Sequence, residues 1–178
     1  MNITGTDADV AARFLRDPQL FTEVHDRCFT AVYRYVAARL GAQAAEDIAA
    51  ETFLVAFDRR ATFDPERGDL RVWLFGIATN LVSRHRRKEA RHYRALARLE
   101  VVPAVEGPEN WVVAALGPRR QLAQALSRLS QGERDVLLLV ALGQLGYEEV
   151  AEALDIPSGT VGSRLTRARK KLKEALDG

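Results

Sequence analysis

The sequence predicts an all-α protein built from two small helical domains, and three observations support this prediction. Apolar residues make up 47% of the 178 residues, which is enough to form a packed core. They recur with helical spacing, because Leu20, Val24, Cys28, Val32 and Val36 each stand four residues apart. No segment shows a convincing alternation of apolar and polar residues over the length of a strand.

Three helices and one loop are expected in the first domain. The first helix carries the apolar series that starts at Leu20, and the second holds Ile48, Phe53 and Phe57. The sequence ATFDPERGDL, residues 61–70, contains a proline and a glycine and is expected to be a loop. A third amphipathic helix follows and continues into the basic run SRHRRKEARHYR. Its apolar face holds Leu70, Trp73, Leu74, Ile77 and Leu81.

A change in composition predicts the boundary between the domains. The segment LEVVPAVEGPENWVVAALGP is acidic, holds three prolines and two glycines, and lacks helical periodicity. Helical spacing resumes after it, and Ser130 and Glu133 have the spacing of a capping box. We therefore predict one domain over residues 1–98, a flexible linker over 99–118 and a second domain over 119–178.

The end of the chain predicts a helix-turn-helix. The segment YEEVAEAL is followed by a turn at Asp155–Pro157 and then by a basic helix whose Val161, Leu165, Ala168 and Leu172 share one face. The second helix of such a motif enters the major groove, where Lys, Arg, Ser and Thr contact phosphates and base edges. An amphipathic helix with a solvated basic face is the alternative. Roughly opposite the apolar face lie Thr160, Ser163, Arg167 and Lys170.

The third helix predicts a second nucleic-acid surface. Thr79, Ser83, Arg86 and Arg87 are expected to lie away from its apolar face, and Phe75 is expected to lean off that face. Phe63 stands in the preceding loop. Aromatic rings beside cations suit single-stranded bases, including a base pulled out of a duplex. The competing interpretation is that such aromatic residues pack in the core, as they usually do.

Composition and motif counts argue against several other classes of protein. Cys28 is the single cysteine, which excludes a disulfide framework and a Cys-rich zinc site. No apolar run reaches the ~20 residues of a membrane span, and the N-terminus lacks the features of a signal peptide. Glu89 and His92 have the spacing of a di-iron motif, but such sites need that motif twice. We expect a cytoplasmic protein that has no metal or cofactor.

Three segments together resemble the extracytoplasmic-function (ECF) group of bacterial RNA polymerase sigma factors over nearly the whole chain. AEDIAAETFLVAF is similar to the helix that docks on the clamp of the polymerase's largest subunit. FDPERGDLRVWLFGIATNLVSRHRR is similar to the loop and helix that recognise and melt the −10 element. LSQGERDVLLLVALGQLGYEEVAEALDIPSGTVGSRLTRARKKL is similar to the domain that reads the −35 element.

The resemblance implies partners and a role for each surface. It implies binding to the clamp and flap of core polymerase, to promoter DNA and to an anti-sigma factor. It also implies that the chain itself is not an enzyme. It assigns core docking to Asp47, Glu51 and Phe53. It assigns −10 recognition to Phe63, Asp69, Asn80, Ser83, Arg84, Arg86 and Arg87. It assigns −35 recognition to Ser158, Thr160, Ser163, Arg164, Arg167, Lys170 and Lys171.

The chain departs from the family pattern at three positions, and other classes of protein stay open. Gly162 stands where the family typically carries Lys or Arg, Ala50 stands where glutamine is usual, and Gly146 replaces a serine. A free-standing helix-turn-helix regulator would bind a palindromic site without polymerase. A helical adaptor would bind acidic partners with no DNA-sequence preference. A metal-dependent helical enzyme would hold stoichiometric iron or zinc.

Overall fold

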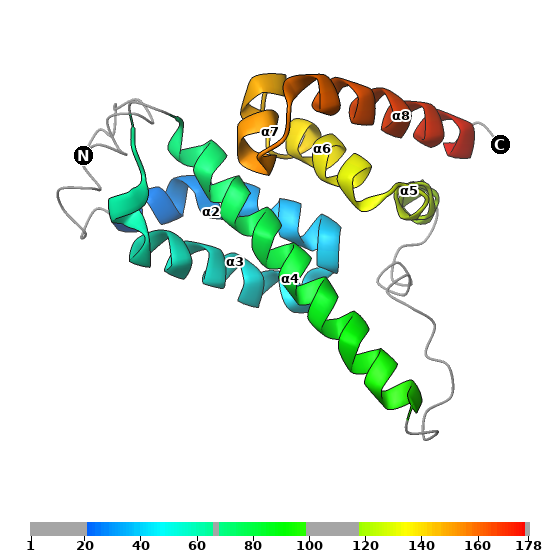
Figure 1. Cartoon of the computed structure of the whole chain (residues 1–178), viewed down its shortest axis with the longest axis horizontal. Coiled ribbons are helices and arrows are strands. Elements are labelled where there is room, and N and C mark those ends of the chain that lie inside the picture. The colour runs from blue at the N-terminus through cyan, green and yellow to red at the C-terminus, as the bar shows by residue number, and fades with distance from the viewer. Residues whose placement is uncertain (1–20, 66–67, 99–117, 177–178) are drawn as a thin grey trace.

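The computed structural model describes residues 21–65, 68–98 and 118–176, and in these ranges the chain forms helices and turns without a strand (Figure 1). The all-α prediction is therefore confirmed. Leu20 and most of the predicted linker, residues 99–117, lie outside the described residues. The elements are α2 (Phe21–Leu40), α3 (Ala42–Asp58), the short 3-10 helix η2 (Arg60–Thr62), α4 (Leu70–Arg98), α5 (Pro118–Ser127), α6 (Gln131–Ala141), α7 (Tyr147–Leu154) and α8 (Ser158–Leu176).

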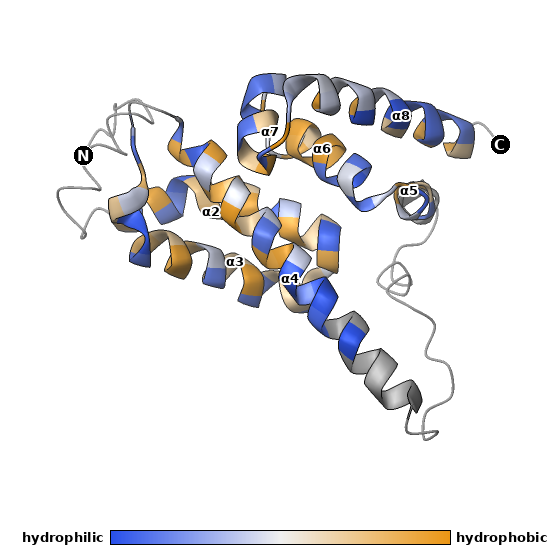
Figure 2. Cartoon of the chain, viewed as in Figure 1, coloured by the Kyte–Doolittle hydropathy of each residue, from blue (hydrophilic) through white to orange (hydrophobic). Residues whose placement is uncertain are grey.

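Helices α2, α3 and α4 form the N-terminal group. Gly41 joins α2 to α3 with a φ of 82°, a left-handed conformation that favours glycine at a helix end. The buried side of α2 includes Val24, Val32 and Val36, as the spacing predicts, while Cys28 is half-buried. Figure 2 shows the apolar positions of these helices turned toward one another.

The predictions that Phe75 leans off the core face and that Thr79 lies on the outward polar side are wrong. Thr79 is 6% exposed, and its hydroxyl donates to the Phe75 carbonyl at 2.8 Å. Phe75 is fully buried, and its ring meets the ring of Tyr35 edge-on with 5.6 Å between their centroids. Helix α4 contacts α2 and α3 on one side and α7 on another. Because α4 is covered on more than one side, a single apolar stripe does not describe its buried surface.

Helices α5 to α8 form the C-terminal group. The predicted capping box at the start of α6 is confirmed. The hydroxyl of Ser130 accepts a hydrogen bond from the Glu133 amide at 3.3 Å, and the Glu133 carboxylate accepts one from the Ser130 amide at 2.9 Å. The predicted turn after α7 is also present, with Asp155 at a φ of 51°. The Ile156 amide donates to the Ala151 carbonyl at 3.0 Å and closes the end of α7.

The two groups pack against each other through a continuous buried core. This core runs from Val36 in α2 through Phe75 in α4 to Leu139 in α6. A Cβ on Gly76 of α4 would lie 3.1 Å from the Ala153 carbonyl oxygen of α7, so the missing side chain lets these helices approach closely. None of the described helices combines the length and apolar character needed to cross a bilayer.

Candidate nucleic-acid interface

Helix α8 presents hydroxyl and cationic side chains on the face opposite its buried side. Val161, Leu165 and Ala168 are buried, which confirms the predicted inner face. Thr160 and Lys171 are half-buried at its edges. The exposed side chains of α8 include Ser158, Ser163, Thr166, Arg167, Arg169, Lys170 and Lys173. This outward face has the composition that the major groove and its phosphates require.

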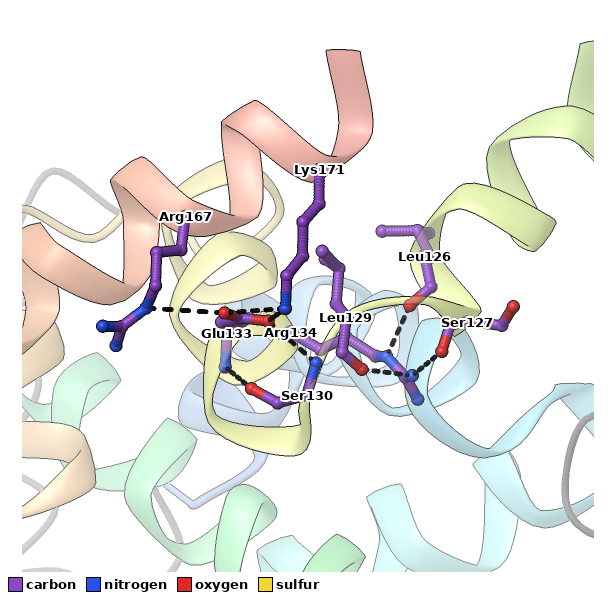
Figure 3. A network of polar contacts seen from close by, with 8 residues as sticks. All are labelled: Leu126, Ser127, Leu129, Ser130, Glu133, Arg134, Arg167 and Lys171. Carbon is purple, nitrogen blue, oxygen red and sulfur yellow. Dashed lines mark hydrogen bonds and ion pairs between the residues drawn. The ribbon is translucent and has the colours of Figure 1, made fainter. Parts of the chain in front are cut away.

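Glu133 of α6 anchors two of the predicted DNA-binding cations. Its carboxylate lies 2.8 and 3.1 Å from the Lys171 Nζ atom and 3.5 Å from the Arg167 Nε atom (Figure 3). The hydrogen bond from Lys171 is the main reason that the pKa of Glu133 lies below its ordinary value of 4.5. The Arg167 side chain is nevertheless 60% exposed, so its guanidinium is accessible to a phosphate or a base.

Replacing Glu133 by glutamine is expected to destabilise the C-terminal group at neutral pH by about 1–3 kcal/mol, because charged hydrogen bonds to Lys171 and to the Ser130 amide are lost. The lowered pKa means that this stabilisation is complete above pH 4.5 and is lost as the pH falls through the folded-state pKa. Urea unfolding of wild type and Glu133→Gln at several pH values measures the difference. Glu174→Gln, at an exposed site, is the matched control. A difference that grows toward acid pH would contradict the account.

Arg164 does not share the outward face of α8. Its guanidinium lies over Gly132 at the start of α6, where an added Cβ would be 2.9 Å from an Arg164 nitrogen. Arg164 also lines a cleft of about 400 Å³ between the two helix groups, together with Asn80 and Ser83 of α4 and Asp155 after α7. The structure thus brings side chains predicted to read the −10 and −35 elements to one cleft.

The basic part of α4 carries the other predicted DNA-binding side chains. The Ser83 hydroxyl accepts a hydrogen bond from the Gln131 side chain of α6 at 2.9 Å. Arg87 is exposed and donates to the Ser83 carbonyl at 3.2 Å. Arg86 is half-buried, and its charge acts on Asp135 of α6. A second cleft, of about 490 Å³ between α3 and α4, is lined by Ile48, Glu51, Leu81, Arg84, His85, Arg87, Lys88 and Arg91.

Two residues of the loop before α4 have structural roles in the folded chain. Phe63 is only 7% exposed, and its ring packs on Trp73 with 5.2 Å between the centroids. The core interpretation of Phe63 is therefore correct, and this ring is not available to stack on a base. The Asp69 carboxylate accepts a hydrogen bond from the Arg71 amide at 2.7 Å and so caps the start of α4.

On α3, one residue that was predicted to dock a partner is buried, and one exposed residue was not predicted. Asp47 and Glu51 are exposed, as expected, but Phe53 is 2% exposed among the rings of Phe21, Phe29 and His25. Phe53 therefore supports α3 from inside. Leu54, which the sequence prediction missed, is 62% exposed. Its position three residues after Glu51 and seven after Asp47 places it on the same helix face, so the helical spacing alone could have identified it.

Gly162 lies in open space on α8, because an added Cβ would meet no atom within 4 Å. Gly162→Ala is therefore expected to stabilise α8 by about 1 kcal/mol, since glycine is a poor helix former. Gly132→Ala is the contrasting control, because Arg164 must move to admit its Cβ. Hydrogen exchange of α8 amides measures the effect, and faster exchange in Gly162→Ala would contradict the prediction.

The described side chains contain no group of three or more His, Cys, Asp or Glu residues that could hold a metal ion. Half-buried His25 lies against Phe29 with 4.7 Å between the ring centroids. Glu89 and His92, which have the spacing of a di-iron motif, fall in the part of α4 whose side chains lie outside the described residues.

A helix-turn-helix, a second basic helix and an acidic helix face with one exposed leucine are together the features expected of a protein that binds DNA and a protein partner. Residues 20–92 match the family model of sigma-70 region 2, and residues 119–172 match that of sigma-70, region 4. The chain is 32% identical over 172 residues to the ECF RNA polymerase sigma factor SigW of Bacillus subtilis, and the match covers 90% of each chain. It is 33% identical over 141 residues to the RNA polymerase sigma factor CnrH of Cupriavidus metallidurans, covering 74% of this chain and 73% of CnrH.

Solved structures agree with this relationship. The structure of CnrH in complex with the cytosolic domain of CnrY matches with a TM-score of 0.71 and 26% identity, over 96% of this chain and 97% of that one. The sigma factor RpoE of Bartonella quintana, in complex with the anti-sigma factor NepR, shares the fold with a TM-score of 0.72 and 23% identity, over 88% of this chain and 96% of that one. The chain belongs to the ECF group of RNA polymerase sigma factors, and it binds core polymerase and directs promoter recognition and transcription initiation.

Proposed function

We propose that this sigma factor binds its partners through three surfaces. The exposed face of α3 binds the polymerase, and the basic part of α4 and the outward face of α8 bind promoter DNA. The observation that carries the proposal is the order of these surfaces along the chain. The first two lie within the match to sigma-70 region 2, and the third lies within the match to region 4. The proposed domains are residues 1–98 and 119–178, joined by a linker over 99–118.

The polymerase would bind the face of α3 that carries Asp47, Glu51 and Leu54. Two carboxylates and an exposed leucine follow one another along this face, and protein interfaces commonly combine an apolar contact with charged groups. Ala50 is exposed on the same helix and adds little to this surface. A basic partner surface with an apolar pocket would complement it, because opposite charges steer the encounter and the leucine is desolvated at the centre.

Promoter DNA would bind the two basic helices. On α8 the contacts would come from Ser158, Thr160, Ser163, Arg167, Lys170 and Lys171, with Arg164 joining them once the cleft beside α4 opens. On α4 they would come from Asn80, Ser83, Arg84, Arg86 and Arg87, with Asp69 at the start of the helix. Phosphate contacts would position each helix, and a few side chains would specify the sequence.

The chain would recognise the promoter and help to open the DNA strands, while the polymerase catalyses RNA synthesis. This role requires no catalytic group, cofactor or metal of its own, and it places the protein in the cytoplasm with the polymerase. The similar sigma factor RpoE is seen in complex with the anti-sigma factor NepR, and CnrH is seen with the cytosolic domain of CnrY. We propose that an anti-sigma factor likewise controls this chain.

Replacing Arg167 by alanine is expected to weaken promoter binding by the polymerase–sigma complex by about 1–3 kcal/mol if Arg167 reads a base. If Arg167 contacts only phosphate, affinity falls for all sequences alike and the salt slope becomes shallower by about one unit. Binding to single-base promoter variants at several salt concentrations separates these cases. Arg169→Ala is the matched control, because Arg169 is exposed on the other flank of the buried stripe. Wild-type binding by Arg167→Ala would contradict its assignment.

The division into three surfaces can be tested with purified protein and sigma-free bacterial core polymerase. Binding is measured first, and the complex is then footprinted on a promoter recovered from genomic fragments. We expect protection at two separated elements, with loss of upstream protection when the exposed Arg167 and Lys170 of α8 are both replaced by alanine. Protection of one palindromic site by the protein alone would instead support a free-standing regulator.

A further inference from the structure

Two hydroxyl side chains lie near the centre of the outward face of α8. Ser163 and Thr166 are both exposed and stand three residues apart. Successive residues of an α-helix are turned by about 100°, so this spacing places the two side chains side by side on one face. The buried residues Val161, Leu165 and Ala168 lie on the opposite side of the helix. Both hydroxyls therefore face any DNA that binds the outward side of α8.

The proton of each hydroxyl is already used inside the helix. The Ser163 hydroxyl donates to the Thr160 carbonyl at 3.0 Å, and the Thr166 hydroxyl donates to the Gly162 carbonyl at 2.9 Å. A hydroxyl has one proton and two lone pairs, so a hydroxyl that donates to the backbone keeps only its lone pairs for a further partner. Both side chains therefore present hydrogen-bond acceptors to DNA.

The backbone beside these hydroxyls is uncovered. A Cβ added at Gly159 or at Gly162 would meet no atom within 4 Å. Both glycines lie on the same face as Thr166, because they precede it by seven and four residues. Serine and threonine side chains are short, so they reach a base edge only where the helix backbone itself lies close to the base. The two glycines permit this approach, since neither has a side chain that would hold the helix away from the groove.

An acceptor at the floor of the major groove discriminates between bases. The donors in this groove are the amino groups of adenine and cytosine, whereas guanine and thymine present only acceptors. An acceptor that faces guanine or thymine loses its water and gains no hydrogen bond in return. Residues 163 and 166 are separated by about 4.5 Å along the helix axis. Successive base pairs are separated by about 3.4 Å, so the two hydroxyls can reach amino groups on neighbouring base pairs.

We propose that Ser163 and Thr166 specify the −35 element by accepting hydrogen bonds from the amino groups of adenine or cytosine. This inference rests on the proposed binding of α8 to promoter DNA, and it makes Thr166 a specificity-determining residue of that surface. Basic side chains such as Lys170 attract the phosphates of every sequence, whereas the two acceptors distinguish one base from another.

A promoter library in which the −35 element is randomised measures this discrimination. The polymerase–sigma complex is expected to favour adenine or cytosine over guanine or thymine about fivefold at two positions of one strand, which is the contribution of one hydrogen bond. Thr166→Val keeps the branched shape and the methyl group but removes the acceptor, so it is expected to lose the preference at one of these positions. Ser163→Ala is expected to lose the preference at the other position.

Two control variants separate the hydroxyl from the rest of the side chain. Thr166→Ser keeps the acceptor without the methyl group and is expected to keep the preference. Thr30→Val makes the isosteric change at an exposed position of α2 and is expected to leave both preferences unchanged. A preference that survives in Thr166→Val and disappears in Thr166→Ser would show that the methyl group contacts a base, and it would overturn the inference. Wild-type preferences in both Thr166→Val and Ser163→Ala would also overturn it.

Base analogues establish which atom is recognised. In the preferred promoter, the selected adenine is replaced by unsubstituted purine, or the selected cytosine by pyrimidinone, so that hydrogen takes the place of the amino group. The wild-type complex is expected to bind the analogue about fivefold more weakly, whereas the variant that lacks the matching hydroxyl binds both DNAs equally. Equal losses in wild type and variant, or no loss in wild type, would overturn the acceptor role.

Failure of the proposed function would give a different result. If α8 did not bind promoter DNA, the wild-type complex would show no preference in the −35 library, and Arg167→Ala would bind every sequence as wild type does. A −35 preference that depends on Arg167 but not on Ser163 or Thr166 would leave the proposed function intact and would overturn this inference alone.

Discussion

Leu54→Lys is expected to weaken binding of the protein to core polymerase by at least about 2 kcal/mol, which is roughly a 30-fold loss of affinity. Leu54 is 62% exposed on α3, on the same helix face as the proposed contacts of Asp47 and Glu51, and in the complex it would be desolvated in the interface. A lysine there would bury a charge facing a surface that is itself proposed to be basic. Unpaired buried charges are among the most damaging changes at an interface.

The measurement is a titration of core polymerase with labelled protein, and Leu176→Lys is the matched control. Leu176 is 50% exposed at the end of α8, away from α3, so the same change of side chain there is expected to leave affinity unchanged. Because both leucines are exposed, neither change should affect folding. Wild-type affinity of Leu54→Lys would show that this face of α3 does not bind the polymerase.

Arg134→Met is expected to destabilise the C-terminal group by about 3 kcal/mol or more, because it leaves buried carbonyl groups without donors. The Arg134 guanidinium donates to the carbonyls of Leu126, Ser127 and Leu129 at 3.0, 3.1 and 3.0 Å (Figure 3). Burial lowers the pKa of Arg134 to about 10, so the group is still charged at neutral pH. One side chain thus closes the end of α5 and fixes it to α6.

Hydrogen exchange followed by mass spectrometry measures this loss within the full-length chain. We expect faster exchange in α5, α6 and α8 of Arg134→Met, while α3 keeps its wild-type protection. Arg128→Met replaces an exposed arginine near the end of α5 and is expected to change little. Wild-type protection of α5 in Arg134→Met would contradict the role of this guanidinium.

The sequence predicted those features that depend on neighbouring residues. The capping box at Ser130 and Glu133 and the turn at Asp155 follow from spacing and local chemistry, and both are present. The inner face of α8 was predicted in the same way, because residues such as Val161 and Leu165 recur with the period of a helix. Local rules were sufficient wherever the partner of a residue lies within one or two helical turns.

The predictions of burial are wrong where contacts between distant helices, and not local spacing, determine which side chains are buried. Phe75 was placed off the core because a helical wheel assumes one buried side, whereas α4 is covered by α2, α3 and α7. Phe53 was predicted to dock a partner, yet the surrounding aromatic rings bury it and leave Leu54 outside. The pairing of Arg39 with Asp135 joins distant parts of the chain, and no local pattern marks either residue for it.

The central claim is that this chain gives bacterial core polymerase a promoter specificity of its own. The most direct measurement is to sequence the 5′ ends of transcripts made from genomic DNA of the source organism by sigma-free core polymerase, with and without the protein. The account predicts discrete start sites that depend on the protein and share two short upstream motifs, one near −10 and one near −35. Identical 5′ ends with and without the protein would contradict it.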